Sequence, residues 1–152
     1  MFFFLKYIDI EMYQKQEEKN VEISNNGNKT LLINPNCPIG IIKDYLQNQL
    51  LIPDDQPFDL CTEKGKQIKL NEISVIESGL EILKEREIYY VILPNNLDET
   101  PSILTPLLSK QSKEYSDFML LQKKRSSIIK MRKGSSTKSR DALSNSSSTT
   151  KQ

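Results

Sequence analysis

The sequence contains no histidine and only two cysteines among its 152 residues. Without histidine, the commonest general base and most zinc-binding and nucleophile-base arrangements are excluded. Two cysteines make no disulfide framework, and they fit a reducing compartment as free thiols. No segment approaches the roughly 20 apolar residues of a membrane span, and the apolar start from Met1 to Leu5 is shorter than a signal-peptide core. We therefore expect an intracellular, cytoplasmic protein, and a nuclear location stays open.

Little else in the sequence supports enzymatic chemistry. Cys37 lies near the expected start of a helix, where the helix dipole favours a reactive thiolate, but it lacks a histidine to activate it. Gly65 and Lys66 form an isolated turn without the spacing of a phosphate-binding loop. The neighbouring acids Asp54 and Asp55 are typical of a solvated loop end rather than of a metal site. We expect no catalytic residue, cofactor or metal, so the chain is predicted not to be an enzyme; a thiol enzyme stays open only through Cys37.

The charge is distributed unevenly along the chain. Residues 109–152 contain eleven Lys and Arg against three Asp and Glu, a net charge of +8. Residues 1–108 contain ten against seventeen, a net charge of −7. The sequence therefore predicts an acidic domain that is followed by a basic tail.

A strand, a helix and a proline stop form the centre of the predicted domain. Thr30 to Ile33 has the apolar and β-branched content of a strand, which Pro35 ends. A helix follows, with Asn36 expected to cap it and Pro38 in its first turn. Its apolar residues recur at spacings of three and four, which predicts a helix buried on one side. They are Ile39, Ile42, Leu46 and Leu50.

The other elements complete an α+β pattern. In chain order they are a strand at Phe2 to Tyr7, a long polar loop at 9–28 that we expect to be mobile, a strand at Phe58 to Cys61, a turn at Gly65, a short strand at Gln67 to Leu70, an irregular or short helical connection at Glu72 to Arg86, and a strand at Glu87 to Leu93. The order is ββαββ-connection-β. We expect the helix to lie across one face of a mixed sheet.

This pattern resembles ubiquitin and its β-grasp relatives. Met1 to Lys6 resembles the opening strand of that family, and the passage from Leu31 to Gln56 matches without a gap, including the helix lysine, here Lys43, and the Ile-Pro stop at Ile52-Pro53. Gly65 to Ile68 is similar to the family's Gly-Lys-Gln-Leu turn. The resemblance implies a ubiquitin-like β-grasp fold over roughly residues 1–94.

The whole chain also resembles an uncharacterised family of ubiquitin-like proteins typified by a human X-chromosome open reading frame. The shared passages are Asn34 to Cys37 and Asp59 to Cys61. That family implies a fold but no activity. A conjugated modifier ends in Gly-Gly just after its last strand, whereas here Pro94 follows Leu93 and the chain continues, so we expect no conjugation.

The predicted organisation has four parts. Residues 1–97 form the β-grasp domain, 98–106 a linker, 107–133 a basic amphipathic helix, and 134–152 a disordered tail rich in Ser and Thr. In the domain, we expect Ile39, Ile42 and Leu46 to press against the sheet. Their predicted partners are Met1, Phe3, Leu5, Leu31, Phe58, Leu60 and Val91.

Alternation along the strands sends the opposite set of side chains outward, where exposed aromatic residues favour a protein-binding patch. The predicted patch residues are Phe4, Lys6, Asp59, Cys61, Lys66, Tyr90 and Ile92. An alternative is that the 9–28 loop or the tail helix covers this face.

The tail helix is the second candidate site. Its predicted contact residues are Phe118, Leu121, Lys123, Lys124, Arg125, Ile128 and Met131, which share the apolar stripe with Leu108 and Tyr115 or supply charge beside it. Ser126 and Ser127 follow a basic run and are candidate phosphorylation sites, because phosphate would reduce the positive field. Such a helix docks on its own domain, or weakly contacts an anionic membrane or a calmodulin-like protein.

The sequence thus predicts a non-enzymatic protein-protein interaction module, a ubiquitin-like adaptor or scaffold. The alternative is a regulatory or targeting protein that acts through the basic helix at 107–133. We expect protein partners, no specific nucleic acid and a monomeric chain.

Overall fold

The computed structural model describes residues 1–18, 27–94 and 104–134, and the side chains of these residues up to Ile128. The predicted disordered tail after Gly134 lies outside the described residues. The strands are β1 (Phe3–Tyr7), β2 (Lys29–Ile33), β3 (Asp59–Thr62), β4 (Ile88–Leu93) and β5 (Thr105–Pro106). The helices are α1 (Ile10–Glu18), α2 (Ile39–Gln49), α3 (Gly79–Ile82) and α4 (Lys113–Gly134), with a 3₁₀ turn at Leu70–Glu72.

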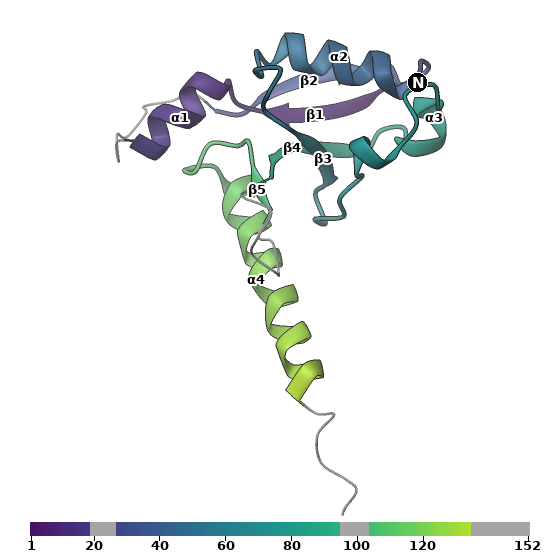
Figure 1. The fold of residues 1–152 in the computed structure, drawn as a ribbon. Coiled ribbons are helices and arrows are strands. Elements are labelled where there is room, and N and C mark those ends of the chain that lie inside the picture. Colours follow the sequence, from purple (N-terminus) through teal and green to yellow (C-terminus); the bar gives the residue numbers. More distant parts are fainter. Residues whose placement is uncertain (19–26, 95–103, 135–152) are drawn as a thin grey trace, which may run out of the picture.

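The strands form one mixed five-stranded sheet in an α+β fold. Its order is β2-β1-β4-β3, and β5 pairs with the end of β4. The central pair β1 and β4 is parallel, and the other pairs are antiparallel. Figure 1 shows α2 lying along one face of the sheet, while α4 leaves the opposite side and extends away from the domain. We call the side packed by α2 the inner face and the opposite side the outer face.

The inner face holds the main core, as the spacing of the α2 residues predicts. Ile39, Ile42 and Leu46 are buried, together with Leu50. Their predicted sheet partners Phe3, Leu5, Phe58, Leu60 and Val91 belong to the same buried cluster, and Leu31 packs against it. The prediction for Met1 is wrong, because strand pairing begins at Phe3 and Met1 is 66% exposed.

The start of α2 differs from the prediction. Asn36 does not cap it: Pro38 stands at the N-cap, without a side-chain hydrogen bond. The first amides bind backbone carbonyls instead, Ile39 N donating to Glu77 O at 2.8 Å and Gly40 N to Val75 O at 2.9 Å. A chain segment that is distant in sequence thus supplies the acceptors that a capping side chain would offer.

The predicted loop at 9–28 contains a helix. Residues Ile10–Glu18 form α1, which buries Ile10 and Tyr13 against the core. The spacing of three between these two residues places them on one side of a helix, a signal too short to stand out among the charged residues around it. Residues 19–26 lie outside the described part of the chain.

The predicted linker at 98–106 is wrong at its C-terminal end. Thr105 and Pro106 pair with β4, and the next residue, Leu107, lies between Val91 and Ile8. Leu107 N donates to Val91 O at 2.7 Å, and Ile8 N donates to Leu107 O at 3.0 Å. The chain after 103 therefore completes the sheet beyond the end of β1, and the folded unit does not end at residue 97.

The predicted short strand at Gln67 to Leu70 is also reduced. Gln67 makes one isolated bridge to Cys61, and the chain then enters the 3₁₀ turn through Lys69, whose φ is 66°. The turn at Gly65 is present, with a φ of 73° that favours glycine.

Candidate functional site

The outer face of the sheet was the predicted binding patch, and the structure buries most of it. Cys61, Tyr90 and Ile92 are each less than 5% exposed. They pack with Leu108 and Phe118, so the alternative in which the tail helix covers this face is the one that the structure shows. We call these five residues the covering cluster. Alternation predicts which way a side chain points, but it carries no information about a later segment that packs on it.

Phe118 is the centre of the contact between α4 and the sheet. Its ring meets the ring of Tyr90 edge to face, with 5.7 Å between the centroids and an interplanar angle of 77°. Tyr115 and Met119 are partly buried around it. Such an aromatic pair adds about 0.5–1.5 kcal/mol to the area that it buries.

Polar contacts hold the first turn of α4. Lys6 Nζ lies 3.0 Å from Glu114 Oε1, and Asn28 Nδ2 donates to Glu114 Oε2 at 3.4 Å. Asn28 Oδ1 also accepts from Ser109 N at 2.8 Å. A hydrogen bond from its own backbone amide and then the Lys6 ammonium keep the pKa of the Glu114 carboxyl below its ordinary value. The predicted patch residue Lys6 thus serves as an internal contact.

A second polar contact lies farther along α4, at the Gly65 turn. Arg125 Nη1 donates to Gly65 O at 2.9 Å. Gln122 lies over the same turn, but its buried amide nitrogen finds no hydrogen-bond partner among the described residues. The contact between α4 and the turn is therefore imperfectly satisfied.

The two titratable residues of the covering cluster are held in their neutral forms. Burial raises the pKa of the Cys61 thiol to about 12, with a smaller contribution from Asp59. Burial also raises the pKa of Tyr90, and Glu63 adds to the effect. A thiol with so high a pKa is not a nucleophile near neutral pH, so Cys61 is a packing residue here.

Asp59 was predicted to face outward in the binding patch, but it is buried and has a structural role. Its Oδ1 accepts from Leu60 N at 2.7 Å and Leu70 N at 2.9 Å. Its Oδ2 accepts from Gln67 Nε2 at 2.8 Å and Lys69 N at 2.9 Å. The buried carboxylate thereby ties the start of β3 to the loop that follows the Gly65 turn. Sequence contains no direct signal for this role, because three of the four donors come from residues 67–70, which form no regular strand.

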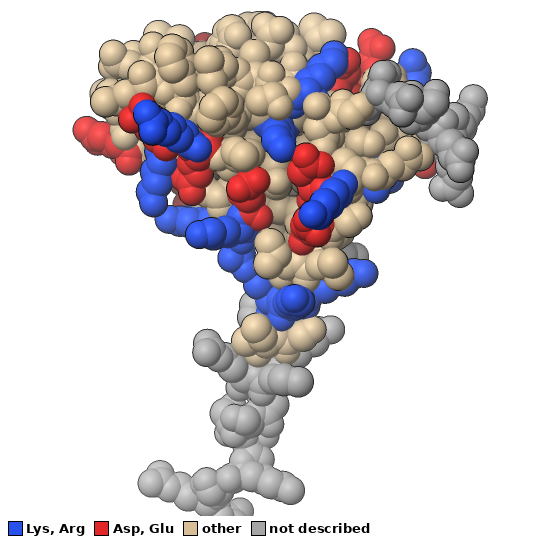
Figure 2. Space-filling view, turned by 180° about the vertical axis from the view of Figure 1, so that it is seen from behind, with Lys and Arg blue, Asp and Glu red and all other residues tan. Residues whose placement is uncertain are grey.

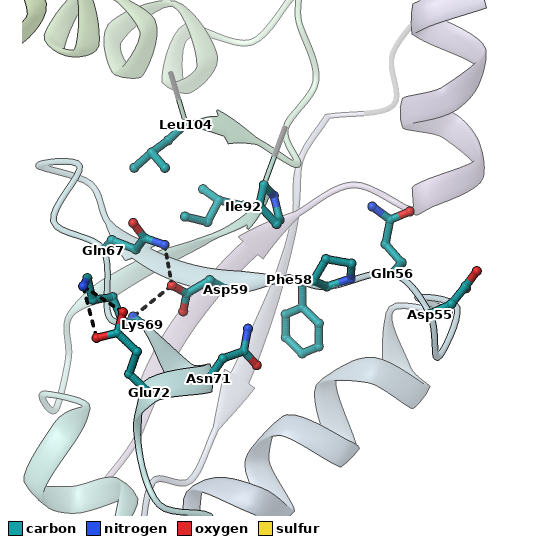
Figure 3. A pocket seen from close by; sticks show the side chains of 12 residues that line it. Asp55, Gln56, Phe58, Asp59, Gln67, Lys69, Asn71, Glu72, Ile92 and Leu104 are labelled. Carbon is teal, nitrogen blue, oxygen red and sulfur yellow. Dashed lines mark hydrogen bonds and ion pairs between the residues drawn. The ribbon is translucent and has the colours of Figure 1, made fainter. Parts of the chain in front are cut away.

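A groove of about 670 Å³ opens beside Asp59 (Figure 3). Phe58, Asn71 and Ile92 are among the residues that line it, and Lys69 and Glu72 pair across 2.8 Å at its rim. Figure 3 shows Gln67 and Lys69 bonded to Asp59, and Lys69 paired with Glu72; with Leu60 and Leu70, the Asp59 carboxylate accepts four hydrogen bonds. The charged groups nearest Asp59 are therefore already engaged with one another.

Part of the outer face stays open beside α4. Phe2, Phe4 and Leu32 are 48%, 37% and 51% exposed. Phe4 pairs with Leu32 across β1 and β2, and on its other side with Ile88 of β4, which packs against the covering cluster. Phe2 lies directly before β1 and is likewise exposed. We call Phe2, Phe4 and Leu32 the open strip. Of the predicted patch, Phe4 belongs to this strip, and Lys66 is exposed at the Gly65 turn.

The helix α4 begins six residues later than predicted, and only part of its predicted apolar stripe is buried. Of the predicted stripe, Leu108 and Phe118 are buried, Tyr115 is half-buried, and Leu121 and Ile128 are exposed. The side chain of Met131 lies outside the described ones.

Basic side chains surround the described part of α4. Lys123, Lys124 and Arg125 are exposed, and Figure 2 shows Lys and Arg gathering at the base of the domain and along the helix. The candidate phosphorylation sites Ser126 and Ser127 donate to the carbonyls of Gln122 and Lys123 at 3.0 Å each. Both hydroxyls are therefore bonded within the helix.

Two negative findings concern the described residues only. Across 1–18, 27–94 and 104–134, no group of three or more His, Cys, Asp or Glu side chains could hold a metal ion. In the same ranges, no helix has both the length and the apolar character that crossing a bilayer requires.

The fold and the covered face define an α+β protein whose C-terminal helix packs on its own mixed sheet. A family model described as "Il2rg: Putative Interleukin 2 receptor, gamma chain" matches residues 26–112, which is more than half of the chain. The chain belongs to this family. The match spans β2 to β5 and ends one residue before α4. Neither the curated proteins nor the solved structures contain a significant match to the chain.

Proposed function

We propose that this chain is a non-enzymatic protein-protein interaction module with a ubiquitin-like β-grasp fold, and that it is not a conjugated modifier. The strand order β2-β1-β4-β3, the parallel central pair and the helix between β2 and β3 support the fold assignment. The continuation of the sheet through β5 and Leu107 argues against a free tail directly after β4.

The open strip is the observation that carries the proposal. It places Phe4 beside Leu32 on the outer face, with Phe2 directly before β1, and each of the three is more than a third exposed. Burying such side chains in water-excluding contact with a partner contributes about 25 cal/mol for each Å² of apolar surface. The strip adjoins the covering cluster through Ile88, so a partner would extend an existing apolar surface.

Proximity labelling of the full chain in cells tests the proposal, with Phe4→Glu as the disrupting variant. We expect Phe4→Glu to lower the labelling of the main partner more than tenfold, because a charge would be buried in the contact. Ile76→Glu is the matched control, since Ile76 is exposed elsewhere on the domain. Equal labelling by both variants and the original chain would contradict the role of the strip.

The second candidate function is regulation or targeting through α4. Lys123, Lys124 and Arg125 are exposed on it, and the sequence from Phe118 to Gly134 contains no Asp or Glu. An acidic protein, calmodulin-like in its chemistry, or an anionic membrane is the proposed partner, and no specific nucleic acid is proposed. The paired substitution Lys123→Glu and Lys124→Glu should abolish this contact and leave the Phe4-dependent one intact.

We further propose that the chain works as a monomer in the cytoplasm and that Cys37 is not catalytic. Both cysteines are free thiols, which fits a reducing compartment. Imaging of a fluorescently tagged chain tests the location, and light scattering tests the oligomeric state. Cys37→Ser should leave partner labelling unchanged.

A further inference from the structure

The contact between α4 and the sheet rests on few interactions. Phe118 is the one α4 side chain in the covering cluster, because Leu108 precedes the helix. The inner face, by comparison, receives Ile39, Ile42 and Leu46 from α2. Because α4 buries fewer apolar side chains against the sheet than α2 does, its attachment to the sheet is much weaker.

Replacing the polar contacts of α4 by contacts with water would cost little free energy. The Lys6–Glu114 pair keeps 25% and 34% side-chain exposure, and pairs of that kind contribute little to stability. Arg125 donates to a backbone carbonyl, and both groups would find water if they separated.

The side chain of Gln122 does not strengthen the docking of α4 through its amide nitrogen. Its buried amide nitrogen has no partner among the described residues and lies over the Gly65 turn. A buried donor without an acceptor carries its full desolvation penalty while α4 stays docked. Lifting α4 would hydrate this amide and remove the penalty.

We propose that α4 is a removable cover on the outer face. It lifts from the sheet beyond Ser112 and exposes Cys61, Tyr90 and Ile92, while Leu107 stays held by Val91 and Ile8. The proposal rests on the proposed function in one respect. The uncovered face and the open strip are adjacent, and we propose that the same protein partner binds both. That partner presents what α4 presents: a helix with an aromatic side chain for Tyr90 and a carboxylate for Lys6.

The thiol of Cys61 reports the position of the cover. It is fully buried beneath α4 and becomes open to a disulfide reagent only when α4 lifts or the protein unfolds. The test uses the full chain carrying Cys37→Ser, so that Cys61 is the only thiol. Its labelling rate is measured at neutral pH in rising urea below the unfolding transition. Lifting of α4 exposes little surface, so we expect a rate that hardly changes with urea.

Three variants distinguish lifting from global unfolding. Phe118→Ala should raise the labelling rate at least about tenfold, because the aromatic contact is lost. Gln122→Met should lower it about tenfold, because the unpartnered amide is replaced by an apolar group of similar length. Leu120→Ala is the control and should leave the rate unchanged, since Leu120 is 54% exposed. Labelling that follows global unfolding in every variant would overturn the cover.

A peptide copy of residues 112–128 tests what the uncovered face binds. Added at millimolar concentration to the full chain carrying Phe118→Ala, it should slow Cys61 labelling by occupying the vacated place. The same peptide carrying Phe118→Ala should have no effect. Equal behaviour of the two peptides would overturn the helix-binding claim. None of these measurements uses a cellular partner, so they fail or succeed separately from the effect of Phe4→Glu on partner labelling.

Discussion

The two faces of the sheet are covered in different ways. On the inner face, α2 lies along the sheet and buries Ile39, Ile42 and Leu46, together with its C-cap residue Leu50, in one continuous apolar core. On the outer face, α4 crosses with a single buried aromatic residue, Phe118, and polar contacts on both sides of it. The inner contact therefore determines whether the chain folds. The outer contact determines which surface the folded chain presents.

The largest expected loss of stability comes from a substitution in the core of the inner face. Leu46→Ala removes a fully buried side chain and should lower the free energy of unfolding by about 2–5 kcal/mol. Ile41→Ala, on the exposed side of the same helix, should change it by less than about 0.5 kcal/mol. Urea denaturation followed by far-UV circular dichroism measures both. Similar values for the two variants would show that α2 is not packed on the sheet.

The next largest effect concerns the buried carboxylate at the edge of the outer face. Asp59→Asn places an amide donor among four donors and should destabilise the fold by about 2–3 kcal/mol. Asp55→Asn, at the exposed rim of the groove, should be neutral within about 0.5 kcal/mol. The same urea titration compares them. An unchanged midpoint for Asp59→Asn would mean that Asp59 does not hold the 67–70 loop.

A smaller effect is expected where α4 packs on the sheet. Phe118→Ala should reduce the free energy of unfolding by only about 1–2 kcal/mol, although a core Phe→Ala change typically costs about 3–5 kcal/mol. The reason is that α4 can lift, so the loss cannot exceed the free energy of its docking. Urea denaturation gives the value. A loss as large as that of Leu46→Ala would make α4 an inseparable part of the core.

The smallest effect is the pH dependence of α4 docking. Glu114 has a pKa below its ordinary value of 4.5 in the folded state. Its contribution to stability is therefore fully present above pH 4.5 and is lost as the pH falls through the lowered pKa. Glu114→Gln should remove this part of the acid dependence. Unfolding curves of both proteins between pH 6 and pH 3, taken in steps of about half a pH unit, measure it; parallel curves would exclude the contribution.

The sequence predicted the inner face better than the outer face, for a physical reason. The i, i+3, i+4 spacing in α2 and the alternation in β1 determine which side chains point inward, so Ile42 and Phe3 were predicted correctly. The same alternation correctly placed Tyr90 on the outer face, but it could not reveal that Phe118, 28 residues later, would cover it.

The sequence also did not predict contacts that are made by very short or irregular segments. The strand β5 has two residues, too few for any periodic pattern, yet it extends the sheet. The role of Asp59 depends on amides of an irregular loop, whose positions only tertiary packing determines. Of the candidate patch, only Phe4 and Lys66 remained clearly exposed.

The position of Leu107 has a consequence for a chain that is cut. Leu107 hydrogen-bonds to both Val91 and Ile8, and β5 pairs with β4. A single cleavage between residues 94 and 104 would sever the covalent link but leave the two pieces joined through these backbone bonds. The fragments should elute together in native chromatography and separate only in denaturant, so the nicked protein would behave as a two-chain complex.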